Sequence, residues 1–216
     1  MSDARIQSKI CGLSTPDAVR AALDGGAAYI GLNFFPASPR YVTVDAAVRL
    51  AAPARGRARI VAVLVDPSDA LLDEVARDLK PDFIQLHGPE TPSRALEAGR
   101  RTGAAVIKAM PISDSADVAR AQTYEDAVDH LMFDTKPPKD AVLPGGTGAR
   151  FDWTLLAGRR FARPWFLAGG LDPWNVGEAI SASGAPIVDV SSGVERGPGL
   201  KDPALITAFL DAVRRS

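Results

Sequence analysis

Cys11 is the residue whose chemistry connects most directly with a function. It is the one cysteine among 216 residues, so it has no intrachain disulfide partner and keeps a thiol that can act as a base or a nucleophile. It follows a short strand-like segment at 6–10 and precedes Gly12 and a helix-start pattern at 14–16. The carboxyl ends of parallel strands carry catalytic side chains in α/β folds, which favours a catalytic thiol here. A single cysteine can equally be a small core residue, and its companions must decide between the two.

Asp134 is the second candidate, at the end of a strand-like segment that covers 130–134. Apolar surroundings keep a carboxyl protonated, and a protonated carboxyl can act as a general acid. The alternatives are a helix cap or an ion pair with Lys136. If both segments belong to one parallel barrel, Cys11 and Asp134 lie at the same rim. One group would then take a proton from a substrate and the other would give one.

Two small-residue clusters predict a phosphate site. Gly169 and Gly170 follow one predicted strand, and Ser191, Ser192 and Gly193 follow the next. Loops after the seventh and eighth strands of a (β/α)8 barrel often bind phosphate through backbone N–H groups, and glycine lets the backbone approach the anion. Either cluster alone is also compatible with an ordinary turn. A third segment at 145–148, which contains Gly146, is typical of a lid that folds over a ligand.

Arg40 and His87 are further candidates for contacts with a substrate. Prolines at 36 and 39 stiffen the loop of Arg40, so its guanidinium would be held in a restrained position suited to a carboxylate; the alternative is a solvated surface arginine. His87 ends a predicted strand beside Gly88, where it would position or shuttle a proton, or serve only as a hydrogen-bonded structural residue. His130 lies at the opposite end of its strand and is assigned to structure.

The elements that must position these residues alternate regularly along the chain. Short β-branched runs predict strands at 6–10, 28–33, 60–65, 82–86, 105–109, 130–134, 165–168 and 187–190. Helical patterns follow at 15–25, 45–52, 66–79, 92–101, 113–126, 152–156, 173–182 and 203–214. Eight such units predict a closed (β/α)8 TIM barrel, with a doubly wound open sheet as the alternative. The loops after the second and sixth strands are the longest, which is typical of loops that carry function.

Composition narrows the class of protein. A length of 216 residues fits a single (β/α)8-barrel domain over 1–216, and a net charge of −1 gives no indication of a nucleic-acid partner. The sequence shows no secretory signal and no apolar run long enough to cross a bilayer, and one cysteine favours a reducing cytoplasm. One cysteine and two distant histidines do not form a usual metal site, and no dinucleotide fingerprint is present. We therefore expect a reaction without cofactor or metal.

The motifs together closely resemble phosphoribosylanthranilate isomerase, an enzyme of tryptophan biosynthesis. The matching segments are KICG at 9–12, PASPRYV at 36–42, QLHG at 85–88, FD at 133–134, GGTG at 145–148, LAGGL at 167–171 and VDVSSGVE at 188–195. The resemblance implies an Amadori rearrangement of N-(5-phosphoribosyl)anthranilate to 1-(2-carboxyphenylamino)-1-deoxyribulose 5-phosphate. It implies that Asp134 is the general acid that opens the furanose ring and Cys11 the general base at C2. Arg40 would hold the anthranilate carboxylate, and the last two loops would hold the phosphate.

Some residues depart from the family pattern. Ala149 and Arg150 stand where a lysine is common, Asp66 where asparagine is frequent, and Asp172 and Trp174 alter the start of the seventh helix. A negative charge at Asp172 is unfavourable near phosphate unless it caps that helix.

Two other hypotheses are compatible with the same residues. Lys136 raises the alternative of a Schiff-base aldolase, although its place among prolines argues against a buried amine. A non-catalytic phosphosugar-binding protein on the same fold is another, since a fold does not determine function. An isomerase that also accepts the analogous histidine-pathway aminoaldose is a sub-case of the isomerase hypothesis; that chemistry usually employs two aspartates, and Cys11 in the base position argues against it. The expected partner is the small-molecule substrate, and the chain is a monomer or a homodimer.

Overall fold

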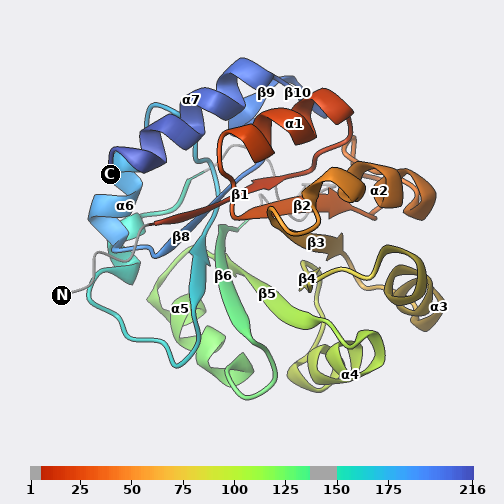
Figure 1. Ribbon diagram of the computed structural model, residues 1–216. Helices are drawn as coiled ribbons and strands as arrows, with labels where there is room; N and C mark the ends of the chain where they lie inside the picture. The colour runs from red at the N-terminus through yellow and green to blue at the C-terminus, as the bar shows by residue number, and fades with distance from the viewer. Residues whose placement is uncertain (1–5, 137–149) are drawn as a thin grey trace.

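The computed structural model describes residues 6–136 and 150–216, and its strands form a closed barrel. Eight parallel strands pair in chain order, and β1 pairs with β8 to close the ring (Figure 1). The strands are β1 Gln7–Cys11, β2 Tyr29–Asn33, β3 Arg59–Leu64, β4 Phe83–Leu86, β5 Ala105–Ile112, β6 His130–Thr135, β7 Trp165–Leu167 and β8 Ile187–Val190. The predicted closed barrel is confirmed, and the open-sheet alternative is wrong.

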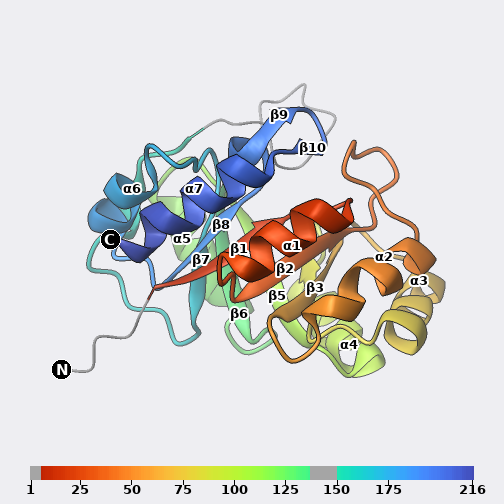
Figure 2. The same ribbon diagram turned by 45° about the horizontal axis from the view of Figure 1, so that its top comes forward.

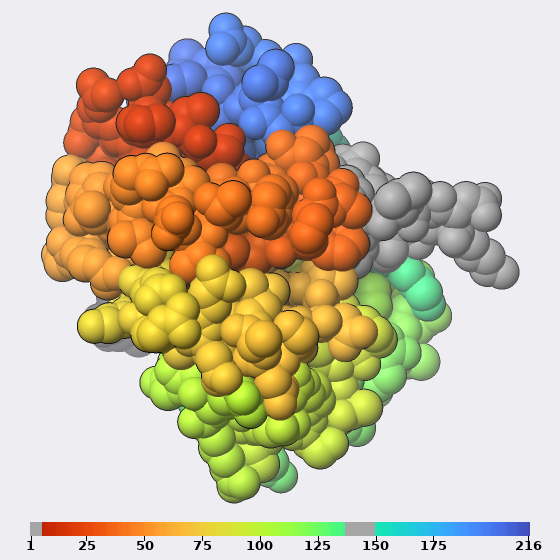
Figure 3. Space-filling model, turned by 90° about the vertical axis from the view of Figure 1, so that its right-hand side faces the viewer, coloured from red at the N-terminus to blue at the C-terminus, as the bar shows by residue number. Residues whose placement is uncertain are grey.

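Helices form the outer layer, and Figure 3 shows the chain from α1 to α4 following down one face in red, orange, yellow and green. The α-helices are α1 Pro16–Asp24, α2 Val44–Ala51, α3 Asp69–Glu74, α4 Pro92–Thr102, α5 Ser115–Ala121, α6 Val176–Ser183 and α7 Pro203–Arg214. Several begin where a side chain accepts a hydrogen bond from the first turn, as Thr15, Thr91 and Asp202 do. None of the helices in the described ranges is both long and apolar enough to span a membrane.

The short helix expected at 152–156 is present as a 3-10 helix, Trp153–Leu156, instead of an α-helix. One further element was not expected. After β8 the chain forms an antiparallel hairpin, β9 Glu195–Gly197 and β10 Leu200–Lys201, which lies at the same end of the barrel as the loop after β2 (Figure 2). These strands are too short to carry a recognisable alternation of apolar and polar residues.

Side chains alternate between the barrel interior and the layer beneath the helices, as the two-residue period of a strand requires. One apolar cluster lies inside the barrel and includes Cys11, Tyr29, Val61, Val63, Phe83, Ile107, Ala109, Met132, Phe166, Ala168 and Ile187. A larger one lies between the strands and the helices. Asp134 follows Met132 by two residues on β6, so it faces the same interior as Cys11. Both residues stand at the carboxyl ends of their strands, and therefore at the same end of the barrel.

The opposite end of the interior is closed by aromatic side chains. Tyr29 contacts Phe83 and Phe166 edge-on, and His130 lies edge-on to Phe83 with ring centroids 5.1 Å apart. Burial lowers the pKa of His130, which keeps it neutral among these rings. The structure therefore places His130 far along its strand from Asp134, in agreement with the structural role expected for it.

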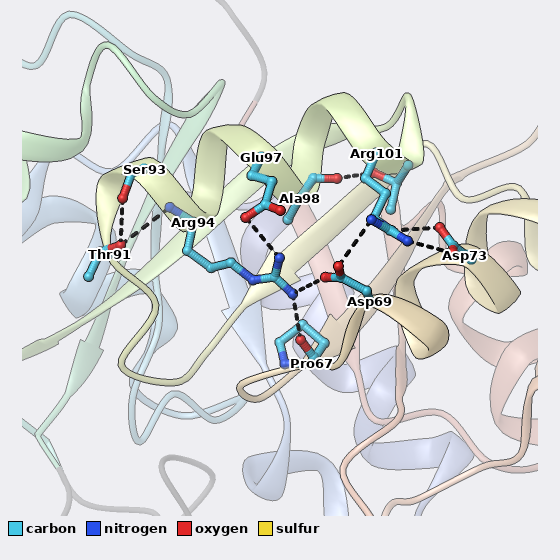
Figure 4. A network of polar contacts seen from close by, with 10 residues as sticks. Pro67, Asp69, Asp73, Thr91, Ser93, Arg94, Glu97, Ala98 and Arg101 are labelled. Atoms are coloured by element: carbon cyan, nitrogen blue, oxygen red, sulfur yellow. Dashed lines mark hydrogen bonds and ion pairs between the residues drawn. The ribbon is translucent and has the colours of Figure 1, made fainter.

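Exposed ion pairs tie α3 to α4 on the outer surface (Figure 4). Arg94 contacts both Asp69 and Glu97, and Arg101 contacts Asp69 and Asp73 at 2.7–3.1 Å. Ion pairs this exposed contribute about 0–1 kcal/mol each to stability. They lie outside the barrel interior.

Candidate active site

Two glycines make room for the side chains around Cys11. A Cβ on Gly31 of β2 would lie 3.0 Å from Cys11 Sγ and 3.2 Å from Lys9 Nζ, so both side chains reach across this position. Gly12 has φ +75°, and a Cβ there would lie 2.6 Å from Arg40 Cδ. The glycine after the cysteine thus lets Arg40 pass over the end of β1. Arg40, although distant in sequence, thus lies against the residue that follows Cys11.

The thiol of Cys11 is buried between charges of both signs. Burial raises the pKa of Cys11, and the ammonium groups of Lys9 and Lys201 oppose this effect. The carboxylate of Asp189 acts in the same direction as burial. The thiol therefore has charged neighbours that favour its ionised form and others that oppose it.

Lys9 and Asp189 form a buried ion pair beneath the thiol, which sequence reasoning missed. Lys9 Nζ donates to Asp189 Oδ1 at 2.9 Å, and the side chains are 0% and 8% exposed. Burial alone lowers the pKa of Lys9, but Asp189 and Cys11 outweigh it and the pKa is raised. A charged residue two positions before Cys11 within a buried strand was the available signal, because unpaired lysines are almost never fully buried.

Asp134 lies next to His87 on the interior of the barrel. Its Oδ2 is 3.1 Å from His87 Nε2, and its Oδ1 accepts the backbone N–H of Thr135 at 2.7 Å. Gln85 Nε2 lies 2.9 Å from His87 Nδ1, on the far side of the ring. The sequence predicts only apolar surroundings for Asp134. The structure adds two polar neighbours of the carboxyl, the His87 ring and the backbone N–H of Thr135. Lys136 contacts Asp117 at 3.5 Å instead of Asp134.

Arg40 is buried and held by a carboxylate of its own chain. Its Nε donates to Glu195 Oε1 at 2.7 Å and its Nη2 to Oε2 at 2.9 Å, which is a bidentate contact. This arrangement uses one edge of the guanidinium and leaves the Nη1–Nη2 edge without an acceptor among the described residues. The alternative of a solvated surface arginine is wrong, because Arg40 is only 6% exposed.

Lys201 links Glu195, the carboxylate that holds Arg40, to the loop after β8. Its Nζ donates to Glu195 Oε1 at 2.7 Å and to the carbonyl oxygen of Ser191 at 2.8 Å. Ser191 Oγ in turn donates to the carbonyl oxygen of Cys11 at 3.3 Å. Burial lowers the pKa of Lys201, while Glu195 opposes that effect. The hairpin that supplies Glu195 and Lys201 was not predicted, and so neither residue was given a role from the sequence.

The loops after β6, β7 and β8 meet closely through glycines. A Cβ on Gly169 would lie 2.9 Å from Asp134 Oδ1, and one on Gly193 would lie 1.9 Å from the carbonyl oxygen of Leu171. The N–H groups of Gly170, Ser192 and Gly193 donate to no acceptor in residues 6–136 and 150–216. These donors are what a phosphate needs at this end of a barrel. Gly146, the remaining predicted binding residue, lies outside the described residues.

Asp172 caps the start of the seventh helical segment. Its Oδ1 accepts the backbone N–H of Asn175 at 2.9 Å, and Asn175 Oδ1 accepts the backbone N–H of Asp172 at 2.9 Å. Arg150 Nη2 donates to Asp172 Oδ2 at 3.0 Å. These reciprocal bonds satisfy backbone N–H groups just ahead of α6, which begins at Val176 instead of the predicted 173, and the arginine offsets the negative charge beside the predicted phosphate loops. The backbone N–H of Trp174 also donates to Asp172 Oδ1 at 2.8 Å, while the residue is 80% exposed.

Asp66 adopts a left-handed backbone conformation with φ 44°. Asparagine and aspartate tolerate this region better than other side chains, which accounts for a residue of this kind at the position. The N–H of Asp66 donates to Glu90 Oε1 at 2.8 Å, so the departure from asparagine keeps the local backbone.

Comparison with known proteins gives a consistent result. A family model described as N-(5'phosphoribosyl)anthranilate (PRA) isomerase matches residues 8–212. The N-(5'-phosphoribosyl)anthranilate isomerase of Caulobacter vibrioides is 63% identical over 217 residues, covering 100% of this chain and 99% of the relative. The solved phosphoribosyl anthranilate isomerase from Thermotoga maritima matches with a TM-score of 0.85 and 32% identity over 98% of this chain and 100% of that one.

A second solved phosphoribosyl anthranilate isomerase was captured with a ligand. It is in complex with reduced 1-(o-carboxyphenylamino)-1-deoxyribulose 5-phosphate. Its TM-score is 0.82 at 30% identity, and the match covers 98% of this chain and 100% of that one.

Proposed function

The chain belongs to the phosphoribosylanthranilate isomerase family, and we propose that Cys11 and Asp134 carry out the isomerisation as general base and general acid. The supporting observation is that both side chains point into one barrel interior at the carboxyl ends of β1 and β6, in a chain that matches the family over residues 8–212. The substrate is N-(5'-phosphoribosyl)anthranilate, and the product is the corresponding 1-deoxyribulose phosphate.

The reaction needs one proton donated and one removed. Asp134 gives a proton to the ring oxygen of the ribose as the bond from C1 to that oxygen breaks, and the nitrogen lone pair forms a C=N bond. The Cys11 thiolate then takes the proton from C2. The electrons of that C–H bond form a C1=C2 double bond, and the lone pair returns to nitrogen. Tautomerisation of the resulting enol gives the ketose.

His87 positions the proposed acid. Its Nε2 lies 3.1 Å from Asp134 Oδ2, within hydrogen-bond distance of the carboxyl. The amide of Gln85 is assigned with its NH2 facing His87 Nδ1, which makes Nδ1 the acceptor and leaves Nε2 as the protonated nitrogen. In this arrangement His87 directs its N–H at Asp134 and holds the carboxyl in place.

Arg40 and the last two loops bind the two ends of the substrate. Glu195 fixes one edge of the Arg40 guanidinium, so the other edge is presented for the anthranilate carboxylate. The backbone N–H groups of Gly170, Ser192 and Gly193 receive the phosphate, with Gly169 and Ser191 shaping the same loops. Lys136 is half exposed and paired with Asp117, which does not favour a Schiff-base aldolase.

Turnover by the purified chain tests this function directly. Phosphoribosylanthranilate is fluorescent, and its fluorescence should decay when enzyme is added without metal. The same gene should restore growth without tryptophan to an auxotroph that lacks the isomerase. A natively folded protein that neither consumes the substrate nor rescues growth would contradict the proposal.

Replacing Arg40 by methionine should raise KM for the substrate about 10- to 100-fold with a smaller change in kcat. The reason is that a charge-assisted hydrogen bond contributes roughly 1.5–3 kcal/mol, and Arg40 meets the carboxylate before and during the reaction alike. Steady-state fluorescence kinetics measure both constants. The loss should disappear with a substrate analogue that lacks the carboxylate, since nothing then remains for Arg40 to bind.

Arg94 provides the matched control for this experiment. It also lies in a carboxylate pair, but on the outer surface between α3 and α4 (Figure 4). Arg94→Met should leave KM within about twofold of the unmodified enzyme, because the pair lies outside the barrel. An equal rise in KM with both substrates for Arg40→Met would show that Arg40 is needed for structure instead of carboxylate binding.

A further inference from the structure

We propose that the buried Lys9–Asp189 pair is a positioning device for the proposed base, in which the Lys9 ammonium stabilises the thiolate of Cys11 and Asp189 keeps that ammonium in place. Neither residue needs to touch the substrate. The inference rests on the proposed role of Cys11, and it concerns how the thiol can ionise inside an apolar barrel.

The geometry brings Lys9 and Cys11 onto one side of β1. Residues two apart on a strand point to the same face, and both side chains extend over Gly31 of β2. A Cβ at position 31 would lie 3.0 Å from Sγ and 3.2 Å from Nζ, tighter than most Cβ contacts, so these groups would have to shift. Gly31 therefore permits the ammonium and the thiol to occupy the same small region.

Asp189 accounts for the charge on Lys9. Position 189 on β8 pairs directly with position 9 on β1, where the barrel closes, and the two side chains are joined at 2.9 Å. A buried ammonium without a partner would lose its proton, whereas a carboxylate at this distance retains it. Lys9 contacts no other carboxylate within the described residues. Lys9 therefore keeps its positive charge and can stabilise the thiolate of Cys11.

The charges facing Cys11 come from three elements. Lys9 on β1 and Lys201 on β10 favour the thiolate, whereas Asp189 on β8 opposes it, and burial opposes it more strongly than any single charge. Gly31 on β2 contributes no charge. Because Lys9 is the largest of the charged influences, removing it should have the greatest effect on ionisation of the thiol.

Alkylation of Cys11 by iodoacetamide tests this inference without any turnover. Cys11 is the one cysteine of the chain, so mass spectrometry of the intact protein reports its modification alone. The rate as a function of pH gives the midpoint of thiolate formation. An inactive enzyme can therefore still support or contradict the role of Lys9, and failure of the catalytic proposal remains a separate result.

Lys9→Met should move this midpoint upward by about one unit or more, which is roughly a tenfold slower reaction at neutral pH. The variant removes a positive charge and leaves Asp189 unbalanced, and both changes disfavour the thiolate. Lys9→Met combined with Asp189→Asn removes both charges, so its midpoint should lie between those of Lys9→Met and the unmodified protein. The double variant has no unpaired buried charge and keeps the test informative if the single variant does not fold.

Lys108 supplies a matched control. It too is a buried lysine on a barrel strand, paired with Glu90 at 2.9 Å, but it lies next to the loop after β4 and away from the thiol. Lys108→Met should destabilise the fold comparably and leave the alkylation midpoint unchanged. If Lys9→Met and the double variant share the midpoint of the unmodified protein, or if Lys108→Met shifts it equally, the inference is overturned.

Discussion

Replacing Cys11 by alanine should lower kcat by about two to four powers of ten and change KM little. General-base catalysis contributes a factor of this size, and the thiol removes a proton in the transition state without binding substrate in the ground state. Fluorescence decay of phosphoribosylanthranilate measures kcat and KM together. A Cys11→Ala enzyme with unmodified kcat would contradict the proposed base.

The pH profile adds a second test of Cys11. The base is active as the thiolate, so the rate should fall as the pH drops through the pKa of this thiol. Because burial raises the pKa of Cys11, the acidic limb should lie higher than that of an ordinary free cysteine. Cys11→Ser, which preserves size but has a far less acidic hydroxyl, should lose this limb together with most of the activity. An unchanged acidic limb in the serine variant would assign it to another group.

Replacing Asp134 by asparagine should also lower kcat by about two to four powers of ten. The amide has the shape of the carboxyl and can still accept the N–H of Thr135, but it cannot supply an acid proton to the ring oxygen. Affinity for a reduced product analogue should change little, since that ligand has no ring to open. Loss of affinity equal to the loss of turnover would indicate that Asp134 organises the site without acting as the acid.

Asp117 is the control for Asp134. It is a buried aspartate near the same end of the barrel, but it belongs to α5 and accepts hydrogen bonds from Ser113 while pairing with Arg120 and Lys136. Asp117→Asn should lower the unfolding temperature and leave kcat within about twofold. A comparable collapse of kcat in both variants would point to general damage at this end of the barrel.

The sequence alone was sufficient for the order of the eight barrel strands and for the barrel they form, but not for the hairpin of β9 and β10. Strand and helix patterns depend on local spacing, and eight alternating units have one economical closed arrangement. For the same local reason, Cys11 and Asp134 could be placed at strand ends. Strand ends are recognised from residues that are close together in the chain, so the sequence displays them directly.

The tertiary structure decided which charges meet. Lys9 contacts Asp189 and Arg40 contacts Glu195 across 180 and 155 positions, and no local pattern predicts these pairs. The first arises from the register with which β8 closes onto β1. The second depends on a hairpin whose strands are too short to recognise. Closure of the barrel sets these partners, because it fixes at once which residues of distant strands share a level and which charges the thiol must face.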